Sequence, residues 1–332
     1  MKITVVGSGA WGTALAISLC KNGHDVTLWA RSAERAEQMN ISRQNPRLPQ
    51  IALPNELAVS ADPACVMGSK LVVIASPSHA IRQVCAQIAA CLDEDAVMVS
   101  VTKGIEPGTL LRMSQVVEEE TKRPVVALTG PSHAEELAQS MPTGCVAAST
   151  NQAYAELVQD AFMSDYFRIY TSPDIVGAEL GGALKNVIAM CAGVTDGMGY
   201  GDNIKAMLMT RGLTEMARLG VAMGANRDTF AGLAGVGDLI VTCTSPHSRN
   251  RRAGILIGQG KTPDEAREQI GAVVEGYYAA KSAGELAKKY GVDMPIVRAA
   301  CAVLYENYTT AQVVEALLNR SKKAESEDSG WN

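Results

Sequence analysis

The chain has 332 residues, of which 47% are hydrophobic and 20% charged, and its formal net charge at pH 7 is −5. This composition is typical of a globular protein and excludes general disorder, and the acidic balance argues against a nucleic-acid partner, which would usually meet a basic surface. Because one hydrophobic core rarely grows past about 250 to 300 residues, the length predicts two domains.

The chain begins with a buried strand pattern at residues 2–6, directly followed by Gly7-Ser8-Gly9-Ala10-Trp11-Gly12 and then by a helical pattern. In a G-x-G-x-x-G turn one glycine makes the bend, one lets backbone N–H groups approach a pyrophosphate, and one packs the helix against the strand. We therefore predict a dinucleotide site here. A strand, turn and helix without a ligand is the alternative interpretation.

Further apolar, β-branched runs alternate with helical patterns as far as residue 173. Strands are expected at residues 25–30, 71–76, 96–101, 124–129, 144–148 and 167–170, and helices at 80–92, 110–120 and 153–163. This alternation predicts an α/β domain over residues 1–173, with a Rossmann-type, doubly wound parallel sheet.

Strand signals stop near Asp174. Helical patterns follow at residues 175–194, 204–223, 264–271, 277–290, 295–305 and 311–318, and they predict an all-helical C-terminal domain over residues 174–320. The polar residues 321–332 are expected to fray. Because no uncharged stretch reaches the roughly 18 residues of a transmembrane helix and no signal-peptide pattern precedes the first strand, we expect a cytoplasmic protein without a membrane span.

The eight cysteines lie in apolar segments without a C-x-x-C pair, and the four histidines lack the H-x-x-x-H spacing of a metal site. These patterns predict buried thiols in a reducing compartment and no bound metal.

Polar residues that directly follow a strand are candidates for ligand contacts, because ligands of open α/β sheets bind beyond the carboxyl ends of the strands. Arg31 follows the second strand, where an NAD enzyme would place an acid, and a cation there suits the 2′-phosphate of NADPH. NADPH is therefore the expected cofactor, with NADH as the alternative. In the other interpretation Arg31 is solvated and Ser32 merely caps the next helix.

Two more positions at this edge are notable. Lys103 could polarise a carbonyl or could be an ordinary solvated lysine. The turn Gly130-Pro131-Ser132-His133-Ala134 could face a substrate or could simply reverse the chain.

The apolar segment 175–194 contains a lysine that needs an explanation. The helical neighbours of Lys185 are all small and predict room for a ligand beside it: Gly181, Gly182, Ala189 and Ala192. Burial would bring its titration near neutrality, whereas a lysine that reaches water would keep an ordinary pKa.

The rest of the helical half offers three further candidates, each with two interpretations. Asp238 either caps a helix or holds a catalytic ammonium. The run Ser248-Arg249-Asn250-Arg251-Arg252 either captures a phosphate or forms a solvated face. Glu275 either touches the cofactor or pairs with a cation.

Taken together, residues 7–16, 102–104, 130–132, 184–186, 237–239 and 248–252 resemble the motifs of the bacterial type of NAD(P)-dependent glycerol-3-phosphate dehydrogenase, in order and from residue 1 to about 320. The resemblance implies reversible hydride transfer between NAD(P)H and dihydroxyacetone phosphate, without a metal. The product would be sn-glycerol 3-phosphate for glycerophospholipid synthesis.

The resemblance also implies roles for the residues noted above. Lys185 would be the general acid, Lys103 would polarise the substrate oxygen, and Asp238 would orient Lys185. The implied substrate-binding residues are Lys103, Gly130, Ser132, Lys185, Asn186, Asp238, Thr242, Ser248, Arg249 and Asn250. With the glycines of the first turn, the cofactor contacts are Gly7, Gly9, Ala10, Trp11, Gly12, Arg31, Lys103, Ala134, Arg249, Val273 and Glu275.

Charge repulsion from Lys103 and Arg249 is expected to lower the pKa of Lys185, while Asp238 opposes it. A β-hydroxyacid dehydrogenase and an NADPH sensor without chemistry are the rival functions. The cluster at Arg249 favours a phosphate substrate over a hydroxy acid. The presence of Lys103, Lys185 and Asp238 favours an enzyme over a sensor. A homodimer is expected because so apolar a helical domain often buries part of its surface against a partner.

Overall fold

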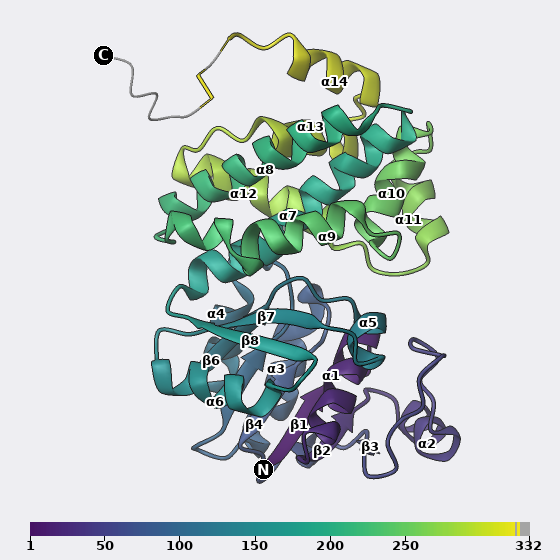
Figure 1. The fold of residues 1–332 in the computed structure, drawn as a ribbon, viewed down its shortest axis with the longest axis vertical. Helices are drawn as coiled ribbons and strands as arrows, with labels where there is room; N and C mark the ends of the chain where they lie inside the picture. Colours follow the sequence, from purple (N-terminus) through teal and green to yellow (C-terminus); the bar gives the residue numbers. More distant parts are fainter. Residues whose placement is uncertain (323, 326–332) are drawn as a thin grey trace.

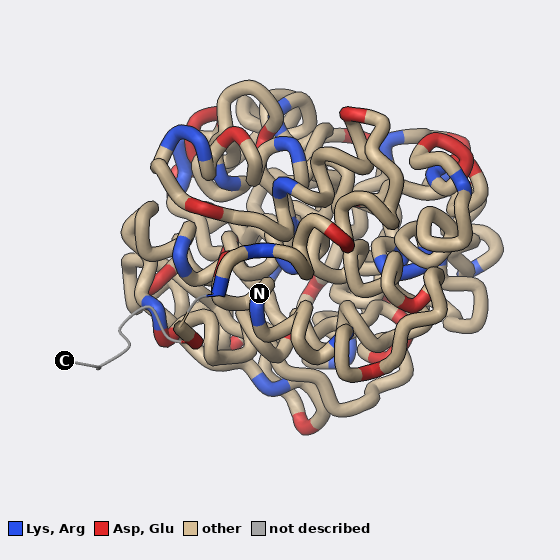
Figure 2. Tube along the Cα trace, turned by 90° about the horizontal axis from the view of Figure 1, so that it is seen from above, with Lys and Arg blue, Asp and Glu red and all other residues tan. Residues whose placement is uncertain are grey.

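The computed structural model describes residues 1–322 and 324–325, and it divides into a sheet half and a helical half (Figure 1). Residues 323 and 326–332, most of the tail expected to fray, lie outside the described residues. The predicted fold class is confirmed: an eight-stranded, mostly parallel sheet is followed, as far as the chain is described, by helices alone. Seen from above, Lys and Arg alternate with Asp and Glu around the molecule (Figure 2).

The strands lie in the order β3-β2-β1-β4-β5-β6-β7-β8. The order reverses between β1 and β4, and this switch point is where open α/β sheets bind nucleotides. The bounds of the strands are β1 (Lys2–Val6), β2 (Asp25–Trp29), β3 (Ala58–Ser60), β4 (Leu71–Ile74), β5 (Val97–Ser100), β6 (Val125–Thr129), β7 (Thr143–Ala148) and β8 (Phe167–Ser172).

Helices cover both faces of this sheet. Alternate residues of β1 enter two different cores: Ile3 and Val5 pack into one, and Val6 into the other. The helices of this half are α1 (Ala10–Lys21), α2 (Ala33–Ser42), α3 (Ile81–Ile88), α4 (Met113–Thr121), α5 (Ala134–Ala138) and α6 (Gln152–Phe162).

One strand departs from the predicted parallel sheet. β7 runs antiparallel to β6, with Thr129 opposite Val146, whereas β7 and β8 are parallel to each other. A parallel neighbour needs a crossover that returns the chain to the opposite edge of the sheet, usually through a full helix. The connection between β6 and β7 holds only the five-residue α5, so the chain reverses instead.

The helical half is built around its longest helix, α7 (Ile175–Gly197). Among the described residues α7 alone is long and apolar enough to cross a membrane, but 89% of its most apolar window is buried inside the protein, as in a core helix. The helices around it are α8 (Asp202–Ala222), α9 (Asp238–Thr244), α10 (Arg249–Gly258), α11 (Pro263–Ile270), α12 (Glu275–Tyr290), α13 (Pro295–Tyr305) and α14 (Thr310–Leu318).

Glycines bring α7 and α10 unusually close together. A Cβ atom on Gly193 of α7 would lie 2.1 Å from the Arg251 carbonyl oxygen, and one on Gly254 of α10 would lie 2.0 Å from the Met190 carbonyl oxygen. Backbone atoms cannot move aside as a flexible side chain can. The two helices therefore pack backbone against backbone.

The same close packing corrects the expectation of ligand space beside Lys185. A Cβ atom on Gly181 would lie 2.2 Å from the Ala234 carbonyl oxygen, and Ala189 and Ala192 are fully buried. The small residues around Lys185 thus admit neighbouring parts of the protein.

A buried carboxylate joins α7 to the sheet half. Glu179 accepts hydrogen bonds from the Ser114 backbone N–H (2.7 Å) and hydroxyl (2.6 Å), and it pairs with Arg112. Since Glu179 lies six residues before Lys185, this contact fixes the part of α7 that leads to the lysine.

Candidate active site

Two lysines from opposite halves of the molecule share one buried carboxylate. Lys103 Nζ donates to Asp238 Oδ2 at 2.7 Å, and Lys185 Nζ donates to Asp238 Oδ1 and, at 2.5 Å, to the Thr242 hydroxyl. Asp238 is 0% exposed and Lys185 only 6%, so Lys185 does not reach water along its stem. The arrangement places two ammonium groups around a single anion.

The local fold explains how these side chains come together. Lys103 lies three residues beyond the end of β5, and Lys185 lies in the middle of α7. Asp238 begins α9 directly after a π-helical turn, η5 (Leu233–Gly237). Its carboxylate bonds the two lysines, so of the two roles the sequence left open it takes the contact with ammonium groups.

Lys103 is held by the turn after β6 as well. Its Nζ donates to the Gly130 carbonyl at 2.9 Å and to the Ser132 hydroxyl at 3.3 Å. Gly130 has a φ of +149°, and a Cβ there would come within 2.9 Å of Cys145 Cα, so the turn requires glycine. Gly130 and Ser132 thus contact Lys103, and their contact with substrate stays a prediction.

The surroundings of Lys185 lower its pKa to about 8. Burial is the largest cause, since it disfavours the charged ammonium, and repulsion from Lys103 adds to it while Asp238 opposes it. The expected opposition of Lys103 and Asp238 is therefore present. Arg249, expected to add to the repulsion, is not among the main causes.

The two predicted substrate amides are bonded to each other. Asn250 Nδ2 donates to Asn186 Oδ1 at 2.8 Å, and Asn250 Oδ1 accepts from the Gly276 backbone N–H at 2.9 Å. Both asparagines are buried. They link the starts of α10 and α12 to α7, next to Lys185.

The basic run at the start of α10 separates into residues with different roles. The Ser248 hydroxyl caps the helix by accepting from the Arg251 backbone N–H at 3.2 Å, and the Arg251 guanidinium pairs with Asp196 at 2.7 Å. Arg249 makes no ion pair with a described residue. Arg249 is thus a cation without an ion-pair partner among the described residues, and the acids Glu275 and Glu135 act on it electrostatically.

The glycine turn after β1 is suited to a pyrophosphate. A Cβ on Gly7 would lie 2.7 Å from the Ala75 carbonyl oxygen and one on Gly12 would lie 2.1 Å from the Gly7 carbonyl oxygen, so the fold itself requires both glycines. At Gly9 the added Cβ would meet no described atom within 4 Å, and no described side chain caps α1 there. The missing Cβ and the uncapped N–H groups of α1 fit the phosphates of a dinucleotide, with Ala10 and Trp11 in its first turn.

Glu275 bridges the two halves. Its carboxylate accepts from the Ser78 hydroxyl at 2.6 Å, and Ser78 follows β4 at the edge of the sheet where the glycine turn lies. Val273 precedes Glu275 by two residues, and Ala134 begins α5 after the Gly130 turn. Three predicted cofactor contacts thus lie on segments that border the space beyond the strands.

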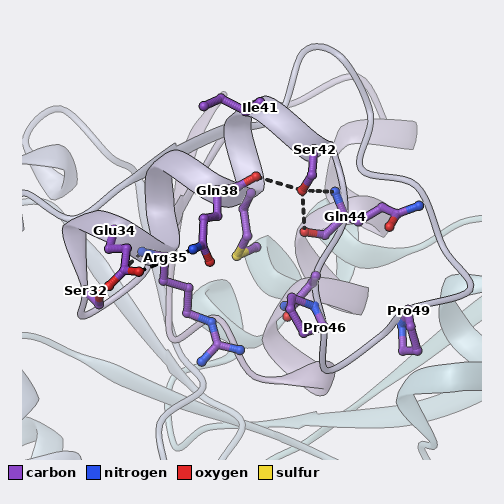
Figure 3. Close-up of a pocket in the computed structure, with 11 residues that line it drawn as sticks. Ser32, Glu34, Arg35, Gln38, Ile41, Ser42, Gln44, Pro46 and Pro49 are labelled. Atoms are coloured by element: carbon purple, nitrogen blue, oxygen red, sulfur yellow. Dashed lines mark hydrogen bonds between the residues drawn. The ribbon is translucent and has the colours of Figure 1, made fainter.

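A cavity of about 840 Å³ opens beyond β2, between α2 and residues 44–49 (Figure 3). Ser32 caps α2, as one interpretation expected, while Arg31 is exposed and has no partner among the described residues. Arg35 points from α2 into this cavity, and its Nε is buried without a described hydrogen-bond partner. Burial, and secondarily Arg47, lowers the pKa of Arg35.

No cluster of three or more His, Cys, Asp or Glu that could hold a metal ion lies among the described residues, and the eight cysteines form no disulfides.

Sequence reasoning missed Ser78 and did not assign a role to His133. Ser78 follows a strand, as Lys103 does, so its position at the carboxyl edge was a usable signal. The partner Glu275 is almost 200 residues away, and no spacing rule joins the two.

The chain matches two family models, the N-terminus (residues 2–155) and the C-terminus (residues 174–315) of NAD-dependent glycerol-3-phosphate dehydrogenase. A relative described as glycerol-3-phosphate dehydrogenase [NAD(P)+] from Thermoanaerobacter sp. is 50% identical over 98% of this chain and 99% of its own length. One of the same description from Geobacillus thermodenitrificans is 52% identical, over 98% of this chain and 97% of its own length. The crystal structure of glycerol-3-phosphate dehydrogenase from Coxiella burnetii superposes with a TM-score of 0.92 at 35% identity, covering 96% of this chain and 99% of the other.

Proposed function

The chain belongs to the NAD-dependent glycerol-3-phosphate dehydrogenase family, and from this membership we propose how its residues act in the reversible reduction of dihydroxyacetone phosphate to sn-glycerol 3-phosphate. The proposal rests on the carboxylate of Asp238, to which both Lys103 and Lys185 are hydrogen-bonded. The reaction supplies the glycerol phosphate unit of glycerophospholipids.

Bound NAD(P)H supplies the hydride. As a bond forms at the carbonyl carbon, the carbonyl π electrons move onto oxygen, and Lys103 and Lys185 stabilise this developing charge. Lys185 then breaks its N–H bond, gives the proton to the oxygen and becomes a neutral amine, which takes up a proton again before the next turnover. A pKa near 8 supports this role, because Lys185 is protonated at neutral pH and yet releases its proton readily.

Asp238 keeps Lys185 in place. With no exposed surface and both oxygens engaged, its carboxylate restricts the rotamers of the two lysines and offsets part of their repulsion. Thr242 holds Lys185 from the next turn of α9. Gly130 and Ser132 orient Lys103 in the same way from the sheet half.

Arg249 binds the phosphate group of the substrate, and Ser248, Asn250 and Asn186 position it. Its guanidinium, which forms no ion pair with a described residue, supports this role, because a guanidinium can bind phosphate oxygens in pairs. Replacing Arg249 with Ala should raise the KM for dihydroxyacetone phosphate about 10- to 100-fold, the effect of losing a hydrogen bond to a charged group. An unchanged KM would require another phosphate site.

NADPH is the preferred cofactor in this proposal, held by the glycine turn, by Lys103, Ala134, Arg249, Val273 and Glu275, and by the cavity beyond β2. Arg31 at the exposed end of β2, and Arg35 with its unpartnered Nε, are cations suited to a 2′-phosphate. In Arg31→Ala the KM for NADPH should rise about tenfold while that for NADH stays unchanged. Equal changes for both cofactors would contradict the preference.

The direct test of the function is the loss of NADPH absorbance when dihydroxyacetone phosphate is added, repeated with NADH. Rapid oxidation is the expected result, and the ratio of the two rates measures the preference. Protein that binds NADPH but oxidises neither cofactor would overturn the substrate.

We keep three further assignments within this proposal: a domain boundary at residues 173/174, a homodimer, and a cytoplasmic location. The dimer is supported by exposed apolar side chains of the helical half, among them Met207, Tyr278, Tyr305 and Leu318. Sedimentation equilibrium at micromolar concentration should give twice the chain mass, and a single-chain mass would contradict it.

A further inference from the structure

Two histidines that the mechanism does not use face each other between the two halves of the molecule. His133 lies in the turn after β6, directly after Ser132, and His247 lies in the turn between α9 and α10, directly before Ser248. Their ring centroids are 5.7 Å apart, with the planes tilted by 56°. Each half of the molecule therefore supplies one ring of this pair, just as each supplies one of the two lysines at Asp238.

His133 has a ring nitrogen without a partner. Its Nε2 is buried, and no residue in the described part of the chain hydrogen-bonds to it. The neighbouring Ser132 hydroxyl is already occupied, because it donates to the Gly130 carbonyl at 2.8 Å and contacts Lys103. Buried polar atoms in native proteins nearly always have a partner, so this atom is expected to find one in a ligand or a water.

Charges on both sides of His133 affect its titration. Burial lowers the pKa of His133 below its ordinary value of 6.5, Lys185 and His247 lower it further, and Glu136 and Glu135 oppose them. The ring is therefore neutral at neutral pH, with a hydrogen on one nitrogen. A neutral imidazole can donate to an anion without a proton being transferred.

The pair lies where segments from the two halves approach the proposed site. His133 follows Ser132, whose hydroxyl contacts Lys103, and His247 lies two residues before Arg249, the proposed phosphate ligand. The two histidines thus join the segment at Lys103 to the segment that begins at Arg249, and His133 Nε2 is a polar atom there without a described partner.

We propose that His133 and His247 form a specificity-determining pair of the substrate site, in which His133 Nε2–H donates to a phosphate oxygen of the bound substrate and His247 covers the other side of that ring. This inference rests on the proposed function and extends it, because it adds a phosphate donor from the sheet half to Arg249 from the helical half. Phosphate recognition then requires both halves.

The test compares His133→Phe, which keeps a planar ring and removes the donor, with His133→Gln, whose side-chain amide restores one. The KM for dihydroxyacetone phosphate should rise about tenfold or more in His133→Phe and return most of the way in His133→Gln. The inhibition constant of inorganic phosphate, competitive with substrate, should rise in parallel. The turnover number at saturation and the Kd for NADPH should stay within about twofold.

His247→Ala provides an independent arm, because His247 is exposed and its replacement leaves the core intact. It should raise the same KM and the same inhibition constant by a smaller factor. An unchanged phosphate inhibition constant in both His133→Phe and His247→Ala, or a KM that rises equally in His133→Gln, would overturn the pair. A wild-type protein that does not turn over dihydroxyacetone phosphate would instead overturn the proposed function itself.

Discussion

Replacing Lys103 with Met should move the titration of Lys185 upward. Both ammonium groups bind the carboxylate of Asp238, so removing Lys103 removes a repulsion and leaves the whole carboxylate to Lys185. In the reduction direction the protonated Lys185 is the active form. The alkaline limb of kcat/KM should therefore follow its pKa, which is about 8 in the native protein.

The size of the shift follows from the geometry. Two ammonium groups on the two oxygens of one carboxylate lie about 5 Å apart, and at an effective dielectric constant of about 20 they repel each other by about 3 kcal/mol. That energy corresponds to about two pKa units. Because the Lys103 side chain is 18% exposed, water screens part of it, and a shift of about one unit or more is expected.

The assay is kcat/KM for reduction of dihydroxyacetone phosphate between pH 6 and 10.5, for the wild type, Lys103→Met and Lys103→Arg. In Lys103→Met the maximum of kcat/KM should fall, because Lys103 also polarises the substrate. The alkaline limb of its pH profile should move from about pH 8 to about pH 9 or above. Lys103→Arg keeps the charge and should leave the limb near pH 8. A limb that is identical in the Met and Arg variants would refute the coupling.

Three further predictions concern the acid, the glycine turn and a buried carboxyl. Lys185→Ala should lower the turnover number about 100-fold or more without changing the Kd for NADPH by more than about twofold, and near-normal turnover would remove Lys185 from the mechanism. Gly9→Ala should weaken NADPH binding without lowering the Tm of the cofactor-free protein. Gly12→Ala should instead lower the free energy of unfolding of the cofactor-free protein by about 1–3 kcal/mol. Equal Tm values in the two variants would contradict this difference. Burial raises the pKa of Glu215, which accepts from the Ile296 backbone N–H, to about 7 from 4.5. The native state then binds more protons than the unfolded chain between these values, so the free energy of unfolding should fall by roughly 3 kcal/mol as the pH rises from 4 to 8. Glu215→Gln should flatten this slope in urea titrations, and an equal slope in both proteins would count against it.

The elements that sequence could predict are those with a long, regular pattern. Strands β1, β4, β5 and β6 are buried on both faces and therefore appear as continuous apolar runs. Three-residue β3 and five-residue α5 are too short to show a period. Strand composition does not record direction, so the reversal at β7 depends on a connection that only the structure shows.

The site divides in the same way. Lys185 could be selected because a charge in an apolar helix needs an explanation, and Lys103 because it directly follows a strand. The hydrogen bond between Asn186 and Asn250 could not be predicted, because no sequence pattern links two amides that are 64 residues apart. The small residues beside Lys185 were misinterpreted because composition does not distinguish space for a ligand from space for another backbone.

The backbone contact between α7 and α10 fixes the spacing of two proposed functional residues. α7 carries the proposed acid Lys185, and α10 begins at the proposed phosphate ligand Arg249. Because main-chain atoms meet at Gly193 and Gly254, a larger side chain at either position would push the two helices apart and change the separation of the proposed acid and phosphate ligand.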